Sequence, residues 1–419
     1  MKKILHISTD DKRGAGSAVI RIHSTLIKKE GIKSKVLCMN KTINDSNIIS
    51  DENFFLKLFF LKIFNRVESL LGFFDKKYYF FNKGRNSIRT VEKFESLLPF
   101  APDIIILYWI SGFLDIKVIR EYLYKNNCTI YWYLLDMEPM TGGCHYSWTC
   151  TEYQKKCDNC PAVCNFYQKI PLRNFSIKKD IVASANIQVI SPSSGVSLQL
   201  EESTIFKDMP KHHIMLGVDE KVFKPLPLIE INKIKNKYGI PIDKKVIFFG
   251  ATNINEERKG GQYLKEALRL VANKGIKSVV LLTAGRKSSL IEFKNINFRC
   301  IHVGYLEGDS QLASAYQVAD LFISPSMQDS GPMMVNESIL CGTPVVAFNI
   351  GVALDLVITN ETGYLAEVGE VNDLARGIVK IIGLSPIKLA IMKKKCRAVG
   401  MNKTSMRVIS EKIISLISN

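Results

Sequence analysis

Short apolar runs alternate with helix-length segments along almost the whole chain, and this alternation limits the possible fold more than any other feature. Each run is typical of a strand buried on both faces, as in a parallel sheet covered by helices. A strand, a helix and a second strand in this order form a βαβ unit with a right-handed connection. The runs are KKILHIS, SKVLCM, DIIILYW, TIYWYLLD and IQVISPS in the first half, and KKVIFFGA, SVVLLTAG, CIHVGY, DLFISPS and PVVAFN in the second.

The two halves predict an α/β chain with two Rossmann-like, doubly wound domains. A segment rich in Pro and polar residues, HHIMLGVDEKVFKPLPLIEINKI, separates them, so the boundary falls near 216–230. We expect a first domain at 1–215, with a Cys-rich insertion at about 141–165, and a second domain at 216–385. Residues 386–419 are expected to form helices, with packing back on the first domain as one arrangement open to them. Their expected solvated face consists of Lys393, Lys394, Lys395 and Arg397.

The charge balance favours anionic partners. A net charge of +17 suits phosphorylated small molecules, a phospholipid surface or nucleic acid. Nucleic acid is disfavoured because the sequence contains no long Lys/Arg block and no recognisable nucleic-acid module. The start, MKKILHIS, is typical of a strand rather than of a secretion signal, and charged residues interrupt the most apolar stretch, 53–74. We therefore expect a cytoplasmic protein. The stretch 53–82 is interpreted either as a core helix pair or as a helix lying on the inner face of the membrane.

The stretch QDSGPMMVNESILCGTPVV, residues 328–346, places two carboxylates after an expected strand. Asp329 lies at the carboxyl end of that strand and Glu337 on the helix that follows. In open α/β sheets, ligands bind at this edge. The expected helix-start and helix-stop residues are Asp329 or Ser330, Pro332, Gly342 and Pro344.

Two glycine-containing turns are candidates for phosphate binding. Gly14, Ala15 and Gly16 follow the first strand and open a helix, although a tight strand-to-helix turn explains them equally well. They do not complete the spacing of a dinucleotide-binding motif, which disfavours a dehydrogenase. In the second half, Arg258 and Lys259 stand before a glycine pair, where Arg offers a hydrogen-bonding fork and Lys a point charge for a diphosphate.

Together these motifs resemble glycosyltransferase family 4, whose members have the GT-B fold of two Rossmann-like domains facing a cleft. That family carries a Glu, seven residues, a second Glu and a Gly-Thr-Pro-Val-Val run, which stand here as Asp329, Glu337 and CGTPVV. The other matching segments are RKGG at 258–261, GVDEKVFKP at 217–225 and NETGYLAE at 360–367. The resemblance spans nearly the whole chain.

The resemblance implies a retaining transfer of a sugar from a UDP- or GDP-sugar to a glycan or lipid-linked acceptor at the cell surface, without a catalytic metal. Glu337 would bind ribose hydroxyls and Asp329 the transferred sugar, while Arg258 and Lys259 would stabilise the leaving diphosphate. Asp136 would act beside the acceptor. The remaining implied donor contacts are Gly331, Pro332, Met333, Gly285 and Arg286, and the implied acceptor or phosphate loop comprises Gly14, Ala15, Gly16 and His145.

Three departures from the family pattern bear on activity. Asp329 replaces a Glu and shortens its reach by one methylene, and Ala251 stands where an Arg is usual. Leu135 precedes Asp136 where many members have a His, so Asp136, Glu138 or His145 would have to substitute. A catalytically silent nucleotide-sugar-binding protein and a sugar-nucleotide epimerase of the same fold are the alternatives.

The segment TGGCHYSWTCTEYQKKCDNCPAVC holds five of the ten cysteines. In a cytoplasmic chain such crowding favours a metal site over disulfides. Tetrahedral sulfur suits one structural zinc, with an iron–sulfur cluster as the competitor and unligated thiols as the simpler explanation. The resemblance extends to a colanic-acid-type subset with the same TGGCHY cluster. The predicted ligands are Cys144, Cys150, Cys157 and Cys160, with Cys164 and His145 as alternatives.

Overall fold

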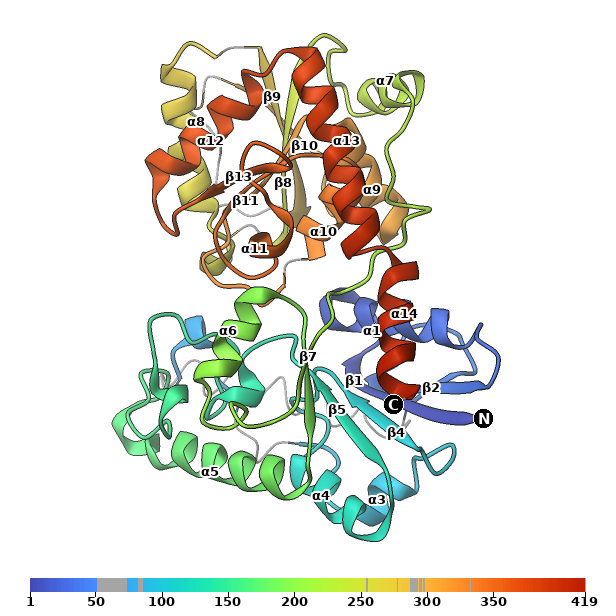
Figure 1. The fold of residues 1–419 in the computed structure, drawn as a ribbon. Helices are drawn as coiled ribbons and strands as arrows, with labels where there is room; N and C mark the ends of the chain where they lie inside the picture. Colours follow the sequence, from blue (N-terminus) through green and yellow to red (C-terminus); the bar gives the residue numbers. More distant parts are fainter. Residues whose placement is uncertain are drawn as a thin grey trace. The chain divides into compact units, whose positions relative to one another are not determined.

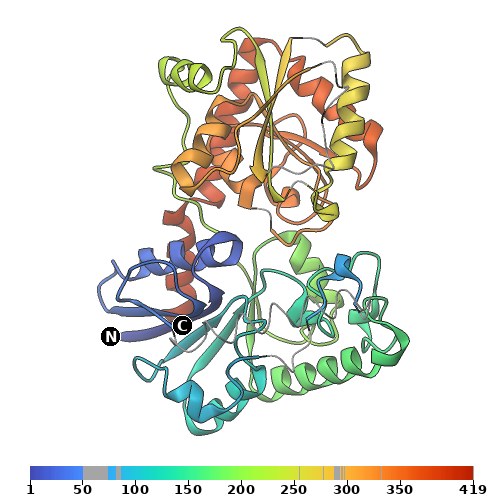
Figure 2. The ribbon, with the colours of Figure 1, turned by 180° about the vertical axis from the view of Figure 1, so that it is seen from behind.

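The computed structural model describes residues 1–50, 74–81, 86–253, 255–276, 278–286, 293, 296, 298–331 and 333–418. The chain divides into two compact units. The first unit comprises residues 1–214 together with 410–419, and the second comprises residues 215–409. Each unit has a parallel β-sheet with helices packed against it (Figures 1 and 2).

The described part of the first unit contains a seven-stranded parallel sheet in the order β3-β2-β1-β4-β5-β6-β7. Strand β1 lies inside the sheet, and its His6 pairs with Val36 on one side and Ile106 on the other. The strands are β1 (Lys2–Asp10), β2 (Ile32–Asn40), β3 (Ile48–Ile49), β4 (Ile104–Leu107), β5 (Thr129–Tyr133), β6 (Gln188–Ser191) and β7 (Lys211–His213).

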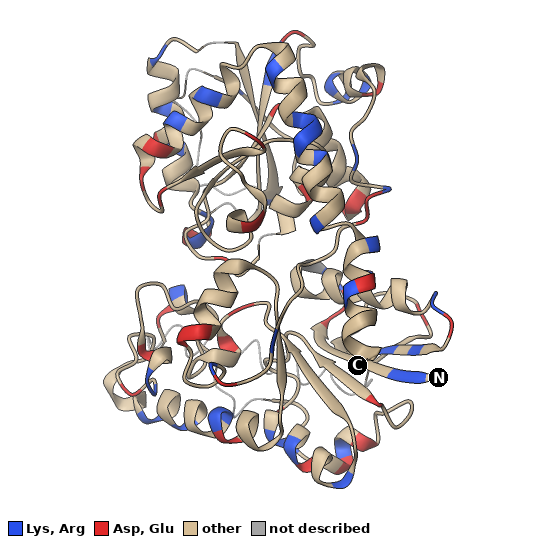
Figure 3. Ribbon diagram, viewed as in Figure 1, with Lys and Arg blue, Asp and Glu red and all other residues tan. Residues whose placement is uncertain are grey.

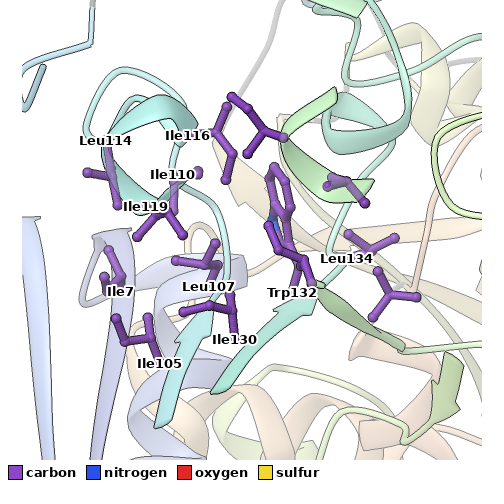
Figure 4. Packing of buried hydrophobic residues seen from close by; sticks show 14 of the residues in the cluster. Ile7, Ile105, Leu107, Ile110, Leu114, Ile116, Ile119, Ile130, Trp132 and Leu134 are labelled. Carbon is purple, nitrogen blue, oxygen red and sulfur yellow. The ribbon is translucent and has the colours of Figure 1, made fainter. Parts of the chain in front are cut away.

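The hydrophobic core on one face of this sheet is shown in Figure 4. Alternate strand residues such as Ile105, Leu107 and Trp132 pack there against Ile116 and Ile119 of α4. The helices of the unit are α1 (Arg13–Leu26), α3 (Val91–Glu95), α4 (Ile116–Lys125), α5 (Lys169–Ser184) and α6 (Ser194–Glu202), with short 3₁₀ helices η1 (Lys76–Tyr78), η3 (Glu138–Met140), η4 (Glu152–Gln154) and η5 (Asn165–Tyr167).

The described part of the second unit contains a six-stranded parallel sheet in the order β10-β9-β8-β11-β12-β13. From β8 the chain runs outward through β9 and β10 and then returns to β11 on the other side. The strand order therefore reverses between β8 and β11, which is where open α/β sheets bind ligands. The strands are β8 (Lys245–Asn253), β9 (Val279–Arg286), β10 (Arg299–His302), β11 (Leu321–Ser324), β12 (Val345–Phe348) and β13 (Gly363–Ala366).

Helices α8 and α12 pack side by side in the second unit, and α10 packs against α9 and α13 (Figures 1 and 2). Helix α14 begins in the second unit, but its residues from 410 onward belong to the first. The helices are α7 (Leu228–Lys237), η6 (Glu257–Lys259), α8 (Gly261–Asn273), α9 (Gly308–Val318), α10 (Met333–Leu340), α11 (Ala353–Leu356), α12 (Val371–Ile382), α13 (Pro386–Lys403) and α14 (Met406–Ser418).

The alternation in the sequence is confirmed, because each of the ten apolar runs contains a strand of a parallel sheet. Three strands lie outside those runs. The two-residue β3 is too short to leave a pattern, β7 lies in the expected connector, and β13 directly follows the Thr362 turn.

The expectation of a solvated face on α13 is wrong for two of its four residues. Lys393 Nζ lies 2.9 Å from Asp320 Oδ1 and is only about one-third exposed. Arg397 Nη1 donates to the carbonyl oxygens of Phe223 at 2.8 Å and Leu340 at 2.7 Å. These contacts hold α13 against the rest of the second unit. Lys393 and Arg397 therefore stabilise the packing of the helix and are not simply solvated. Figure 3 shows other Lys and Arg residues distributed over helices of both units.

The possible membrane-surface helix at 53–82 falls largely on residues 51–73, which lie outside the described residues. In the part of the chain that is described, no helix combines the length and apolar character needed to span a bilayer.

Candidate active site

The loops after β8 and β11 bring three charged side chains of the second unit into contact. Lys259 Nζ lies 2.5 Å from Asp329 Oδ2, and Arg258 Nη1 lies 3.3 Å from the same oxygen. Both cations come from η6, directly after β8, whereas Asp329 follows β11. Because β8 and β11 are the neighbours at which the strand order reverses, the cluster occupies the edge that favours ligand binding.

Gly260 allows these two loops to approach each other closely. Its φ of 68° lies in the left-handed region, and a Cβ there would lie 1.7 Å from the carbonyl oxygen of Pro325. Beside it, Met327 N donates to the carbonyl oxygen of Arg258 at 2.7 Å. A glycine is therefore required for the backbone contact that holds Arg258 and Lys259 against the loop of Asp329.

The cluster pairs its cations with carboxylates. Burial alone would raise the pKa of Asp329, but the Lys259 and Arg258 cations and the hydrogen bond from Lys259 outweigh burial, so this pKa is lower than usual. Arg258 Nε also donates to Glu256 Oε1. Two cations thus face two carboxylates, and an anionic ligand that binds the cations has to compete with these carboxylates.

Glu337 lies on α10, in the element that follows the Asp329 loop. Its side chain is buried, and its Oε2 accepts a hydrogen bond of 3.1 Å from the hydroxyl of Tyr316, a core residue. Gly331 N donates to Asp329 Oδ1 at 3.4 Å, and Met333 is the first residue of α10. Pro332 lies outside the described residues.

Gly285 and Arg286 end β9, the other neighbour of β8. Gly285 has a φ of 143°, and its N–H donates to the carbonyl oxygen of Gly304 at 2.8 Å. The Arg286 guanidinium lies 5.9 Å from the ring centroid of Tyr305, a side chain that is 38% exposed. Ala251, by contrast, is buried near the end of β8 and offers no polar group.

In the first unit, Gly14, Ala15 and Gly16 lie in the first turn of α1. A Cβ at Gly16 would lie 2.7 Å from the carbonyl oxygen of Asp10, so the helix start lies close to the end of β1. Gly14 has a φ of 38°, and no atom lies within 4 Å of the position that an added Cβ would take. The tight strand-to-helix turn is therefore present, and phosphate binding there stays a prediction.

A second polar group of the first unit lies beyond the carboxyl ends of β4 and β5. His145 Nδ1 and Asp136 Oδ2 are 2.9 Å apart, and both side chains are buried. The His145 ring stacks on Trp109, with centroids 4.3 Å apart and planes inclined by 12°. Glu138 Oε1 lies 3.0 Å from Nζ of Lys178, which is fully buried on α5. Sequence reasoning named the acidic residues and His145 but missed Trp109 and Lys178.

The four predicted metal ligands belong to two hydrophobic clusters, but they lie near enough to influence one another's thiol pKa. Cys144 and Cys160 share one small hydrophobic cluster, where their thiols hydrogen-bond and Cys150 packs alongside. Cys157 packs instead in the main core, where burial raises its thiol pKa to about 12. Among the described residues, no three His, Cys, Asp or Glu side chains are placed to hold an ion. The expected set of four is therefore not supported, and a bound zinc stays a prediction that metal analysis would check.

Comparison with known families bears on the second unit. Residues 230–399 match the family model described as "Glycosyl transferases group 1". This segment therefore resembles a glycosyl transferases group 1 domain. Arg258, Lys259, Asp329 and Glu337 all lie inside the matched segment, whereas Asp136 and His145 precede it.

Curated relatives resemble part of the chain. It is 29% identical over 139 residues to D-inositol 3-phosphate glycosyltransferase of Rhodococcus opacus (strain B4), covering 31% of each protein. It is 24% identical over 198 residues to putative glycosyltransferase EpsD of Bacillus subtilis (strain 168), covering 46% of this chain and 49% of that protein. The alignments thus span about a third to a half of these relatives.

Solved structures resemble the whole chain. Sucrose-phosphate synthase from Thermosynechococcus elongatus gives a TM-score of 0.68 at 18% identity, covering 100% of this chain and 98% of that one. Anabaena HepE in complex with UDP and glucose gives a TM-score of 0.65 at 15% identity, covering 100% of both chains. These similarities confirm the fold as two Rossmann-like α/β domains.

Proposed function

We propose that this chain is a retaining glycosyltransferase that moves a sugar from a nucleoside diphosphate sugar to a cell-surface polysaccharide or lipid-linked acceptor. The observation that carries the proposal is the contact of Arg258 and Lys259 with Asp329 at the reversal point of the second unit's sheet. A crystal structure of the similar HepE chain contains UDP-glucose, which supports a nucleotide sugar as donor. Another relative is named as a capsular polysaccharide biosynthesis glycosyltransferase, CapM of Staphylococcus aureus.

In this proposal, Arg258 and Lys259 hold the diphosphate of the donor. Negative charge grows on the leaving diphosphate as the bond to the sugar breaks, so fixed cations stabilise the transition state more than the ground state. The phosphate oxygens would replace Asp329 and Glu256 as partners of these cations. No metal is needed for this chemistry.

The other assigned residues recognise the rest of the donor. Glu337 would accept hydrogen bonds from ribose hydroxyls, and Asp329 would bind the transferred sugar once the diphosphate has taken over its cations. The N–H groups of Gly331 and Met333 would contact sugar or phosphate. The acceptor would bind the first unit near Gly14 to Gly16 and the end of β5, with the protein on the cytoplasmic side of the membrane or at its inner face.

The test is a thermal-shift screen against UDP- and GDP-sugars, followed by assays of sugar transfer and donor hydrolysis. A ligand that binds only the native state raises the apparent stability of the protein. A free ligand concentration of 100 times the dissociation constant adds about 2.7 kcal/mol to the free energy of unfolding. Arg258→Ala or Lys259→Ala should lower the transfer rate about 10²- to 10³-fold, the usual cost of losing one such donor. Glu337→Ala should abolish activity. Lys274→Ala, on an exposed side chain of the same unit, is the matched control.

Each alternative has a distinct result. Donor binding without transfer or hydrolysis would indicate a silent binding protein, and isomerisation of the donor sugar would indicate an epimerase. The absence of any stabilising nucleotide sugar would reject the donor site itself. NMR of the product must show the anomeric configuration of the donor, since inversion would contradict a retaining mechanism.

A further inference from the structure

We infer that helix α13 of the second unit lies against an anionic lipid surface, with Ile387 and Ile391 in the apolar boundary of the lipid and the flanking lysines at the headgroups. The lipid contact involves none of the residues assigned to the donor, so it goes beyond the proposed function. Helix α13 carries several basic residues and no acidic one. Its basic residues are Lys388, Lys393, Lys394, Lys395, Arg397 and Lys403.

One face of α13 packs against the rest of the second unit through buried residues spaced three or four apart. They are Leu389, Met392, Cys396 and Gly400. Lys393 bonds to Asp320, and Arg397 bonds to backbone carbonyl oxygens, so these two cations belong to the packed side. Because the packed face is fixed by these contacts, it determines which residues of the helix face outward.

The outward face of α13 combines isoleucines with lysines. Ile387 is 75% exposed, and Ile391, about one turn later, is 53% exposed. Lys388, Lys394 and Lys395 are exposed as well. At 3.6 residues per turn, all five side chains fall within about 120° of the helix circumference. A helix face that only meets water has no use for two large aliphatic side chains among its lysines.

Most of the positive charge on this face has no counter-charge in the described part of the chain. Lys388 and Lys394 have no ion-pair partner among the described residues, and Lys395 Nζ lies 3.5 Å from Glu361 Oε2. Both side chains of that pair are about half exposed, and an ion pair in such a position contributes little. Figure 3 shows basic residues along the length of α13. The face therefore attracts anions.

A lipid surface uses both kinds of side chain on this face. In an interfacial helix, aliphatic side chains enter the boundary of the acyl chains, while lysines extend their ammonium groups to the phosphates. Nucleic acid would engage the lysines but leave the isoleucines in water. A second copy of the chain, bound through the same face, would bury the isoleucines but bring two sets of lysines together. Anionic lipid is therefore the occupant that the charges and the exposed isoleucines favour.

The test is co-sedimentation of the full chain with vesicles of phosphatidylcholine alone and of phosphatidylcholine mixed with phosphatidylglycerol. The chain should bind the mixed vesicles about tenfold more tightly or better, and added salt should weaken this binding because it screens the lysines. Lys388→Ser and Lys394→Ser should each weaken it about fivefold, the effect of one cation near an anionic surface. Ile391→Ser should weaken it on the order of tenfold, because an aliphatic side chain loses its burial.

Matched controls and a second readout separate lipid contact from a change in folding. Lys274→Ser, exposed in the second unit, and Leu198→Ser, 63% exposed in the first, should leave vesicle binding unchanged. Ile391→Trp should show blue-shifted fluorescence on the mixed vesicles and quenching by brominated lipid, because the side chain enters the apolar boundary. Thermal unfolding and UDP titration should be the same in the α13 variants as in the wild type.

Equal binding to both kinds of vesicle, or binding that the α13 substitutions leave unchanged, would overturn the inference. It would also be overturned if the wild type ignores vesicles but forms a dimer that Ile391→Ser dissociates, since a second copy would then cover the face. These results leave the donor site untouched. If the vesicles bind as expected but no nucleotide sugar does, the proposed function falls and the lipid contact stands.

Discussion

In the proposed function, a donor diphosphate would take the position of the Asp329 carboxylate, which accepts from both Lys259 and Arg258. The carboxylate would hold the two cations in place without a ligand, and it would also compete with phosphate for them. Asp329 differs from the longer Glu of the resembling family, and its direct pairing with the cations is a contact that the motif alone does not specify. Its contact with the cations and its proposed contact with the sugar can be separated by ligands with and without a sugar.

Asp329→Asn should raise the affinity for UDP severalfold while lowering sugar transfer at least tenfold. Removing the charge frees Arg258 and Lys259 for phosphate, but the amide is a weaker acceptor for sugar hydroxyls. Calorimetric titration with UDP and with UDP-sugars measures the first effect, and turnover measures the second. Glu307→Gln, on an exposed carboxylate of the same unit, should change neither. A fall in UDP affinity would show that Asp329 supports the cations more than it competes for them.

A buried histidine pair should make the stability of the first unit sensitive to acid. His6 Nε2 and His23 Nδ1 both bond to Ser34 Oγ, at 3.1 and 2.8 Å. Burial lowers the pKa of His6 well below its usual value, with a further contribution from His23, and burial lowers the pKa of His23 to about 4. The unfolded chain, with ordinary histidine pKa values near 6.5, therefore binds protons in a range where the folded chain does not.

The free energy of unfolding of the first unit should consequently be highest above about pH 6.5 and fall as the pH drops from 6.5 toward 4. Each histidine contributes up to about 1.4 kcal/mol per pH unit in this range. Urea unfolding at pH 7 and pH 5 measures the effect. His23→Leu should make the pH dependence shallower, whereas a change at exposed His213 should not. Equal slopes in all three proteins would contradict the assignment.

At the scale of elements, the close approach of the loops after β8 and β11 depends on a glycine. Gly260 lets the loop after β8 contact Pro325 after β11, and the charged pairs follow from that backbone contact. The sequence predicted that both loops lie at one sheet edge, because carboxyl ends of parallel strands share an edge. It could not predict that a Cβ at position 260 would lie 1.7 Å from the carbonyl oxygen of Pro325, since such a contact depends on tertiary packing and not on local pattern.

Gly260→Ala should destabilise the second unit by more than the left-handed conformation alone costs, and it should weaken donor binding as well. The added Cβ must push the Pro325 backbone away, which separates Lys259 from Asp329. Gly275→Ala is the matched control, because Gly275 has a similar φ of 79° but no atom within 4 Å of its Cβ position. Gly275→Ala should therefore show only the backbone cost, about 1–2 kcal/mol. Thermal unfolding and UDP-sugar titration of both variants check this, and equal effects would show that conformation alone matters.

The contacts within the Cys-rich segment could not be predicted from the sequence. Spacing suggested four thiolates around one ion, whereas in the structure Cys157 belongs to the main core and Cys144 and Cys160 belong to a smaller hydrophobic cluster, so the metal site stays a prediction. His145 and Asp136 meet although they are nine residues apart in irregular structure, where no helical or strand period relates one side chain to another. The helices and strands were predictable from the periodicity of their hydrophobic residues. The contacts made by this irregular segment depend on the tertiary structure and could not be predicted in that way.

At the scale of the molecule, the last ten residues of the chain belong to the first unit. Helix α14 starts in the second unit, but residues from 410 onward belong to the first, where Tyr131 Oη donates to the carbonyl oxygen of Leu416 at 3.3 Å. Ile409 lies in the second unit and Ile417 in the first, and both are buried. The sequence indicated a basic C-terminal helix pair and left packing back on the first domain open, but it did not indicate that the division falls within α14.

The same substitution at two positions of α14 should therefore destabilise different units. Ile409→Ala should lower the unfolding temperature of the transition that a donor nucleotide raises, because only the second unit contains the proposed donor site. Ile417→Ala should lower the other transition, with nucleotide affinity unchanged, and each change should cost about 2–5 kcal/mol as a buried isoleucine. Calorimetry with and without UDP-sugar distinguishes the two transitions, and exposed Ser415→Ala should affect neither. If both isoleucine variants lower one and the same transition, α14 unfolds with a single unit and the division at residue 410 is wrong.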